Sequence, residues 1–193
     1  DAIDALTNSI GDQGYAFIDI RPNIQRDRET GVINITFTIA EGPKVYVERI
    51  DVVGNVRTLD EVVRREFRLV EGDAFSSSKL KRSRQRVENL NFFKSVDVKT
   101  LPGSTPDQTV LEVDVEEKST GEFSIGAGYG TDDGAFGQAG IRERNLLGKG
   151  QDLRLGFTIG SSSQQVDLSF TEPYFLDRDV SAGFDIYRRE EDN

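Results

Sequence analysis

Two pairs of neighbouring aspartates come closest to a catalytic arrangement in this chain: Asp132 with Asp133, and Asp177 with Asp179. Two carboxyl groups can act as general acid and general base when their surroundings push their pKa values apart. Both pairs, however, lie in turn sequences, where aspartate is favoured because its side chain hydrogen-bonds the nearby backbone. We therefore expect neither pair to be a catalytic site.

The residue types on which most enzymes depend are absent. The 193 residues include no histidine and no cysteine, which removes the usual general base, the commonest metal ligand and any thiol nucleophile. Two glycine motifs also fail as phosphate sites. The glycines of GAGYG (126–130) alternate along a predicted strand with no helix after it, and GKG (148–150) lacks the spacing of a phosphate loop. The sequence predicts a protein that is not an enzyme and has no cofactor or metal site.

Charge and hydropathy exclude other classes. The net charge of −10, with no basic arm, argues against nucleic acid as a partner. There is no run of about eighteen apolar residues and no signal peptide pattern, so no transmembrane helix is expected. The chain begins on an amphipathic run without a methionine, which we interpret as a segment of a longer protein.

The first two thirds of the chain contain a repeated unit. A helical stripe at 3–10 is followed by alternating strands at 17–24 and 33–39, joined by a turn that ends at Gly31. The same order returns 76 residues later, which makes a chance match improbable. The matching pairs are Phe17 with Phe93, Ile35 with Leu111, Phe37 with Val113, and Ile39 with Val115.

The second copy is complete because two elements precede it. These are a strand at 45–54 and a helix at 58–67, in which Thr58 and Glu61 form a capping box. Leu59, Val62, Val63 and Phe67 form the buried stripe expected of that helix. Residues 43–118 therefore read as a two-layer α+β module of order β-α-α-β-β, whose edge strands can accept another chain by backbone pairing. Residues 1–42 carry only the second half of such a module.

From residue 120 the helical period ends and five segments of strand length follow. One face of these segments is apolar and the other polar, a pattern that fits a soluble sandwich as well as a transmembrane barrel. Their regular length of about 9–11 residues favours the barrel, although five strands cannot close one. The apolar face is predicted to include Phe123, Ile125, Ala127, Tyr129, Leu153, Leu155, Phe157, Ile159, Val166, Leu168, Phe170, Val180, Ala182, Phe184 and Ile186.

Several motifs of this chain resemble one family. The runs GEFSIGAGYGTDDGAFGQAGIRERNLLGKGQDLRLGF (121–157) and SFTEPYFLDRDVSAGFDIYRRE (169–190) resemble the start of the barrel of the BamA family, the outer-membrane β-barrel assembly factors. The run GNVRTLDEVVRREFRLVEGDAFS (54–76) and the residues that follow it look like the last POTRA (polypeptide-transport-associated) domain of that family. The resemblance covers essentially the whole chain.

The resemblance implies a fold and a function. Residues 1–42 would be the C-terminal part of a POTRA domain, 43–118 a complete POTRA domain, and 119–193 about the first five antiparallel strands of a truncated outer-membrane β-barrel. The implied function is insertion of β-barrel proteins into the bacterial outer membrane, with the POTRA part in the periplasm. Implied partners are unfolded outer-membrane proteins, periplasmic lipoproteins of the assembly complex and outer-membrane lipid. A POTRA-barrel secretion pore of the two-partner type is the alternative.

The resemblance also assigns site residues. Substrates would pair at the first strand of a weak lateral gate, and its glycines would weaken that strand by about 0.5–1 kcal/mol each. The alternative is that these glycines clear room on the lumen side or permit sharp curvature at the barrel start, and curvature explains them as well as gating does. Glu71, with Arg64 and Arg65, would dock a lipoprotein. The alternative is that Glu71 is an ordinary solvent-exposed loop residue and that the two arginines belong to the solvent-exposed face of a helix. Tyr174 and Phe175 would mark the membrane interface or plug the base of the lumen. The gate strand comprises Phe123, Ser124, Ile125, Gly126, Ala127, Gly128, Tyr129 and Gly130.

Overall fold

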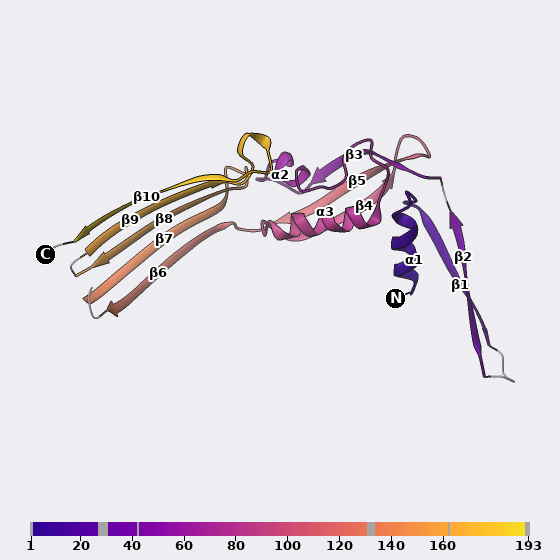
Figure 1. Cartoon of the computed structure of the whole chain (residues 1–193), viewed down its shortest axis with the longest axis horizontal. Helices are drawn as coiled ribbons and strands as arrows, with labels where there is room; N and C mark the ends of the chain where they lie inside the picture. Colours follow the sequence, from indigo (N-terminus) through magenta and orange to yellow (C-terminus); the bar gives the residue numbers. More distant parts are fainter. Residues whose placement is uncertain (1, 27–30, 42, 131–133, 162, 192–193) are drawn as a thin grey trace. The chain divides into compact units, whose positions relative to one another are not determined.

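A computed structural model describes residues 2–26, 31–41, 43–130, 134–161 and 163–191 (Figure 1). The chain divides into two compact units. The first unit comprises Asp1–Gly54, Arg64–Leu90 and Ser95–Val115, and the second comprises Asn55–Val63, Asn91–Lys94 and Glu116–Asn193.

The N-terminal part has the predicted order of helix, strand, strand. Helix α1 (Ala2–Gly11) precedes the antiparallel strands β1 (Ile18–Arg26) and β2 (Ile33–Glu41). The predicted apolar stripe of α1 is its half-buried face, while the residues between are exposed. The predicted turn residues 27–30 lie outside the described part of the chain.

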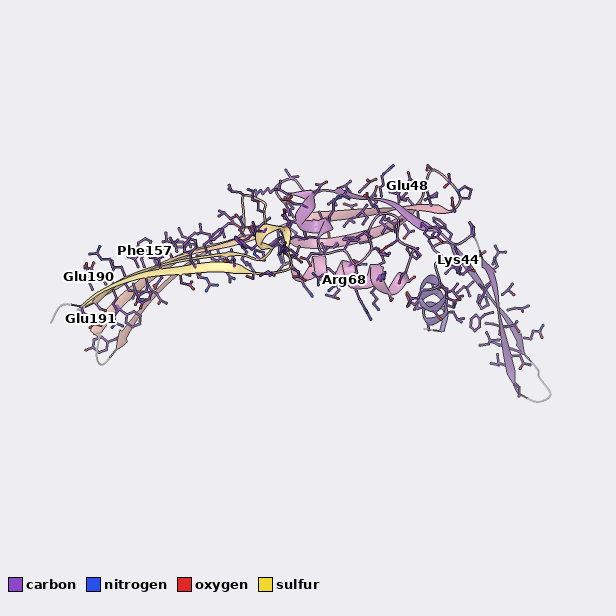
Figure 2. All side chains as sticks on the ribbon, turned by 45° about the horizontal axis from the view of Figure 1, so that its top comes forward. Lys44, Glu48, Arg68, Phe157, Glu190 and Glu191 are labelled. Carbon is purple, nitrogen blue, oxygen red and sulfur yellow. The ribbon has the colours of Figure 1, made fainter. Side chains whose placement is uncertain are left out.

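The complete module has the predicted order β-α-α-β-β. Strand β5 (Gln108–Glu117) lies between β3 (Tyr46–Val53), to which it is parallel, and β4 (Phe93–Pro102). The helices are α2 (Asp60–Arg64) and α3 (Ser77–Asn89), and α3 runs along the sheet (Figure 1). Glu48, labelled in Figure 2, accepts the backbone N–H of Ser104 through Oε2 at 2.7 Å, which ties the turn after β4 to β3.

Helix α3 begins where its sequence provides a cap and packs through a small buried face. The Ser76 side chain accepts the N–H of Lys79, as a helix N-cap does. Ser83 is fully buried, and its hydroxyl donates to the carbonyl of Lys79 and accepts the N–H of Arg68, both at 2.8 Å. Ser83 therefore pairs its hydrogen-bonding groups inside the core, as a buried hydroxyl must. The buried hydrophobic residues of this module in the first unit include Val47, Ile50, Leu69, Phe75, Val87, Leu111 and Val113.

Helix α2 is shorter than its sequence pattern predicts. It has five residues and begins at Asp60. Val62, Val63 and Phe67 are buried as predicted, but Leu59 is 41% exposed, so its predicted burial is wrong. Thr58 precedes the helix, and its hydroxyl accepts a hydrogen bond from the side chain of Asn145.

The last part is a five-stranded antiparallel sheet in which neighbours in sequence are neighbours in space (Figure 1). Such a meander follows directly from short turns between antiparallel strands. A short 3-10 helix, η1 (Phe175–Asp177), lies in the turn before the last strand. The strands are β6 (Gly121–Gly130), β7 (Gly134–Leu146), β8 (Gln151–Gly160), β9 (Ser163–Glu172) and β10 (Ala182–Glu191).

The residues after α1 are joined to the start of α3 by Asp12. Its Oδ1 accepts the backbone N–H of Ser78 at 2.7 Å and the hydroxyl of Ser76 at 2.9 Å. The backbone hydrogen bond from Ser78 is the main cause that lowers the pKa of Asp12, with the Ser78 and Ser76 side chains and Arg82 adding to it against partial desolvation. Gly11 lies so close that a Cβ there would be 1.8 Å from Ser77 Oγ.

Replacing Asp12 with alanine is expected to lower the free energy of unfolding by about 0.5–2 kcal/mol, because the first turn of α3 loses an acceptor. A depressed carboxyl pKa contributes stability above its unfolded value and loses it as the pH falls through the folded pKa. The difference between wild type and Asp12→Ala, measured by chemical denaturation, should thus be full near neutral pH and shrink below about pH 3.8. Asp97→Ala, which removes an exposed aspartate of β4, is the control. An equal loss in both variants would contradict this role of Asp12.

Candidate functional site: the β6 edge and the faces of its sheet

Strand β6 lies at one edge of the five-stranded sheet. It pairs with β7 along its whole length, from Gly121 opposite Glu143 to Gly130 opposite Gly134. Within the described residues no strand pairs with its other edge. Backbone N–H and C=O groups therefore point outward along that edge, which is the arrangement that accepts a further strand.

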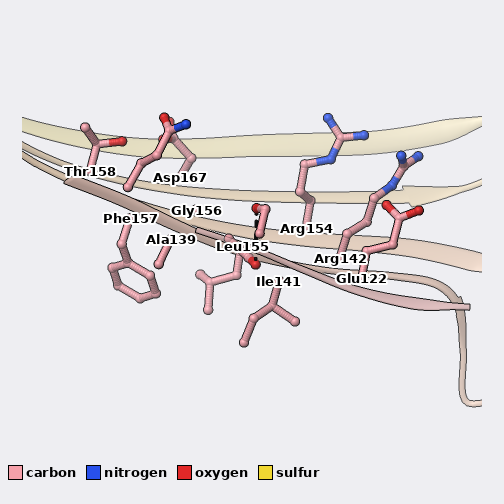
Figure 3. Close-up of a pocket in the computed structure, with 13 residues that line it drawn as sticks. Glu122, Ala139, Ile141, Arg142, Arg154, Leu155, Gly156, Phe157, Thr158 and Asp167 are labelled. Carbon is pink, nitrogen blue, oxygen red and sulfur yellow. Dashed lines mark hydrogen bonds between the residues drawn. The ribbon is translucent and has the colours of Figure 1, made fainter. Parts of the chain in front are cut away.

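The two faces of the sheet differ as the alternation predicts. Figure 3 shows Ala139, Leu155 and Phe157 projecting from one face, and Arg142 and Arg154 from the other. The apolar face is open to its surroundings: Phe123, Ile125 and Tyr129 of β6 are exposed by 70%, 80% and 82%. Large exposed apolar patches of this kind are typical of surfaces that contact a partner or a membrane.

The polar face carries paired charges around a hollow of about 450 Å³. Arg142 binds Asp152 through Nη2 at 2.5 Å, and Arg144 binds Glu122 through Nη2 at 2.7 Å. Arg154 is opposite Arg142 in the register of β7 and β8. The face that the sequence predicts to be wet is thus the charged one.

Two side chains of β7 occupy the space above the glycines of β6. A Cβ on Gly128 would be 2.6 Å from Cζ of the Phe136 ring, and a Cβ on Gly126 would be 2.8 Å from Nε2 of Gln138. These two glycines therefore make room for neighbouring side chains on the polar face, as one of the alternatives for them predicts, while gating and curvature stay predictions. Sequence reasoning missed Phe136, although its alternation with Gln138 places an aromatic ring on the polar face beside glycines.

Glu71 and Arg64 are brought together. Glu71 Oε1 accepts from Arg64 Nη1 at 3.1 Å and from the backbone N–H of Ile50 at 3.3 Å. Arg65 is half-buried. Glu71 thus contacts the backbone of edge strand β3 as well as a neighbouring cation, a contact that the sequence did not reveal.

The same loop covers part of the β3 edge. Val47 donates its N–H to Asp73 at 2.9 Å and accepts that of Gly72 at 2.7 Å, while Val45 accepts the N–H of Phe75 at 3.0 Å. Of the two edges expected to accept another chain, the β3 edge is therefore occupied over these residues. Strand β4 is the other edge of this sheet.

Tyr174 and Phe175 lie in the turn between β9 and β10. Phe175 is 47% exposed, and the backbone N–H of Tyr174 donates to Glu172 Oε1 at 3.0 Å. Since the strands alternate in direction, this turn lies at the same end of the sheet as the β7–β8 turn and the first residue of β6. The two aromatic residues thus lie at one end of the sheet, and their role at a membrane interface stays a prediction.

The two aspartate pairs singled out in the sequence lie in different turn sequences of the chain. Asp132 and Asp133 lie outside the described residues, and Asp177 is in a turn with a φ of 56°, a conformation that suits its backbone role. In the described part of the chain no group of three or more carboxylates is arranged to hold a metal ion. None of the helices that the structure describes has the length and apolar composition needed to cross a bilayer.

Two family models match this chain. Residues 45–118 match the POTRA model, described as a surface antigen variable number repeat, and residues 145–193 match the Omp85 superfamily domain. The outer membrane protein assembly factor BamA of Neisseria meningitidis serogroup B is 38% identical over 94% of this chain and 23% of its own length. The BamA of Nitratidesulfovibrio vulgaris is 39% identical over the same shares. The chain thus spans about a quarter of these relatives.

Solved structures agree with the sequence matches. The crystal structure of BamA from Haemophilus ducreyi lacking POTRA domains 1–3 superposes with a TM-score of 0.85 at 32% identity, over 98% of this chain and 36% of that one. CdiB from Escherichia coli superposes with a TM-score of 0.54 at 16% identity, over 89% of this chain and 32% of that one, which shows a shared fold alone. Taken together, the matches show that the chain is a homologue of the outer membrane protein assembly factor BamA over 94% of its length, with a POTRA module and part of an Omp85 superfamily domain.

Proposed function

We propose that this chain is the part of an outer-membrane assembly factor on which unfolded β-barrel proteins pair before they enter the membrane. The observation that carries the proposal is that one edge of strand β6 is unpaired in the described structure. The apolar side chains of the same strand are also exposed, Tyr129 by 82%. Homology to the assembly factor BamA supports the same function. The substrates are outer-membrane proteins, whose own strands supply the missing backbone partners.

Backbone pairing explains how such a chain works without a catalytic side chain. Each backbone polar group left without a partner in hydrocarbon costs several kcal/mol. A substrate strand that pairs with β6 satisfies these groups on both chains, so pairing itself drives the strand into the membrane. Neither a nucleotide nor a metal takes part in that step.

Glycine residues weaken the pairing of β6 with β7. Gly126, Gly128 and Gly130 each lower the stability of a strand by about 0.5–1 kcal/mol relative to alanine. We infer that β6 is the loose side of a lateral gate, whose exchange of partners is eased by this loss. The first strand of the sheet is therefore the moving one.

The rest of the chain fits the same scheme. We assign residues 1–42 to the end of one POTRA domain, 43–118 to a complete one, and 119–193 to about the first five strands of the barrel. The POTRA part lies in the periplasm, where edge strand β4 is open to extended substrates. Glu71, Arg64 and Arg65 form the docking surface for a lipoprotein, and Tyr174 and Phe175 face the interface of the outer-membrane lipid. No observation favours the alternative of a two-partner secretion pore.

Single cysteines test where substrates pair. The chain has no cysteine, so Ser124→Cys or Ala127→Cys on β6 introduces the only thiol within it. In the full-length protein freed of other cysteines, these variants are expected to form disulfides with a cysteine in the terminal strand of a stalled substrate. Val166→Cys on the inner strand β9 is the matched control on an exposed site. Equal crosslinking at β9, or none at β6 in a folded protein, would refute pairing at β6.

A second experiment separates packing from gating at Gly128. Gly128→Ala is expected to destabilise the full-length barrel by about 1–3 kcal/mol, because the overlap of the new methyl group with the Phe136 ring outweighs the gain of about 0.5–1 kcal/mol that alanine brings to an unobstructed strand position. Phe136→Ala in the same protein should recover part of the loss, measured as the temperature of unfolding in detergent. The control is Gly137→Ala, where a Cβ would meet nothing closer than 4.0 Å. Normal stability of Gly128→Ala with lost assembly activity would instead indicate gating alone.

The docking role of Glu71 can be separated from its structural role. Glu71→Gln keeps an oxygen that accepts the N–H of Ile50 but removes the charge, whereas Glu71→Lys removes both. We expect co-purification of the lipoprotein to fall in both variants, and thermal stability to fall only in Glu71→Lys. Full lipoprotein binding by Glu71→Gln, whose charge is gone, would contradict docking through this carboxylate.

A further inference from the structure

A buried polar contact joins two segments that are far apart in sequence. Asn145, at the end of β7, is 8% exposed, and Thr58, in the loop before α2, is 3% exposed. Asn145 Nδ2 donates to Thr58 Oγ1 at 2.9 Å across 87 residues of chain. Both residues belong to the second compact unit. Burial of two polar side chains is favourable only when their hydrogen bonds are satisfied, so this contact is specific.

Glu117 extends the contact into a relay. Its carboxylate accepts the backbone N–H of Thr58 at 2.7 Å and that of Arg57 at 3.0 Å. The Thr58 hydroxyl has one hydrogen, and since its oxygen accepts from Asn145, that hydrogen is available to the Glu117 carboxylate. Partial burial by itself raises the pKa of Glu117, but these hydrogen bonds outweigh it and lower the pKa. The relay therefore runs from Asn145 through Thr58 to a carboxylate that stays charged.

The turn between β7 and β8 is shaped to receive this loop. Asn145 Oδ1 accepts the N–H of Gly150 at 2.7 Å, and the carbonyl of Gly148 accepts the N–H of Leu59 at 2.9 Å. Gly148 has a φ of 75°, and a Cβ there would be 2.0 Å from the carbonyl oxygen of Arg57. Only glycine permits both the turn conformation and this approach of backbone to backbone.

We propose that Thr58, Glu117, Asn145 and Gly148 form a latch that anchors the end of β7 to the loop 55–59. Strand β7 is the partner from which β6 would release in the proposed function, on which this inference rests. An opening strand needs a neighbour that does not move with it, and the latch holds that neighbour at its turn end. Thr58 and Asn145 are thus positioning residues for the gate. They contact no substrate.

Hydrogen exchange in the full-length protein tests the coupling directly. Thr58→Val removes the hydroxyl while keeping its shape, so Asn145 loses its acceptor and a buried donor is left unpaired. Exchange of amides in both 55–62 and 145–152 is expected to accelerate together by about tenfold or more. Thr58→Ser, which keeps the hydroxyl, should leave both segments protected. Acceleration confined to 55–62 would overturn the latch.

A charge exchange gives a second, independent test. Asn145→Asp places a carboxylate against a hydroxyl that already serves Glu117, so two negative charges compete for one hydrogen. This variant should lose protection in both segments and lose assembly activity. Glu117→Gln in the same protein removes one charge, keeps an acceptor for Arg57 and Thr58, and should restore both. Failure of this rescue would contradict the relay.

A crosslink distinguishes a closed latch from one that must open. Leu59 and Leu147 are exposed by 41% and 77% on the two sides of the contact, so cysteines there are accessible to a short bis-maleimide. The latch predicts rapid crosslinking of Leu59→Cys with Leu147→Cys and unchanged insertion of a model substrate afterwards. Loss of insertion on crosslinking would overturn a latch that stays closed. An uncrosslinked protein that never inserts the substrate would contradict the proposed function instead, whatever the crosslinking rate.

Discussion

The unpaired edge of β6 is the constraint on which the functional features of this chain depend. A strand edge in hydrocarbon must find partners for its backbone groups, because lipid offers none. The exposed apolar face of the sheet fits that surrounding, and the charged opposite face fits water or a filled lumen. Within the described residues, β6 and β10 are the two edges of this sheet that lack a neighbouring strand, so further strands are needed to satisfy both edges in hydrocarbon.

Strand β6 is bound to β7 by backbone pairing along its length and by packing between side chains, and the two strands contribute unequally to that packing beside the glycines. Its glycines contribute no side chains of their own, and the space above Gly126 and Gly128 is occupied by Gln138 and Phe136 of β7. On the polar face, β7 therefore supplies the side chains beside these two glycines, and β7 is also the strand fixed by the proposed latch at Asn145. Release of β6 leaves β7 with its large side chains, its turn contacts and its pairing to β8 intact. In the proposed gate, this asymmetry would let β6 exchange partners while the other strands of the sheet stay paired.

Sequence pattern predicted the elements well because their signals are local. Alternation identified the five strands and assigned Phe123 and Phe157 to the apolar face, and a constant offset revealed the repeated module. The contacts that matter most at the junction were invisible, since Thr58 and Asn145 are joined only by the fold. Thr58 followed by Glu61 matches a capping pattern, yet the helix starts at Asp60 and the hydroxyl turns to another partner. Leu59 was misplaced for the same reason: its backbone N–H is bound by Gly148 and its side chain remains exposed.

The POTRA sheet shows how one edge can be closed so that the other is used. Residues 72–75 bond to β3 through the backbone, and Glu71 adds a side-chain acceptor for Ile50. An exposed edge invites unwanted pairing, so covering β3 restricts a bound strand to β4. Glu71 holds that cover in place while also facing Arg64. In the docking proposed for Glu71, a cationic group of the partner would displace Arg64 from the carboxylate and leave the bond to Ile50 intact, so the β3 edge would stay covered.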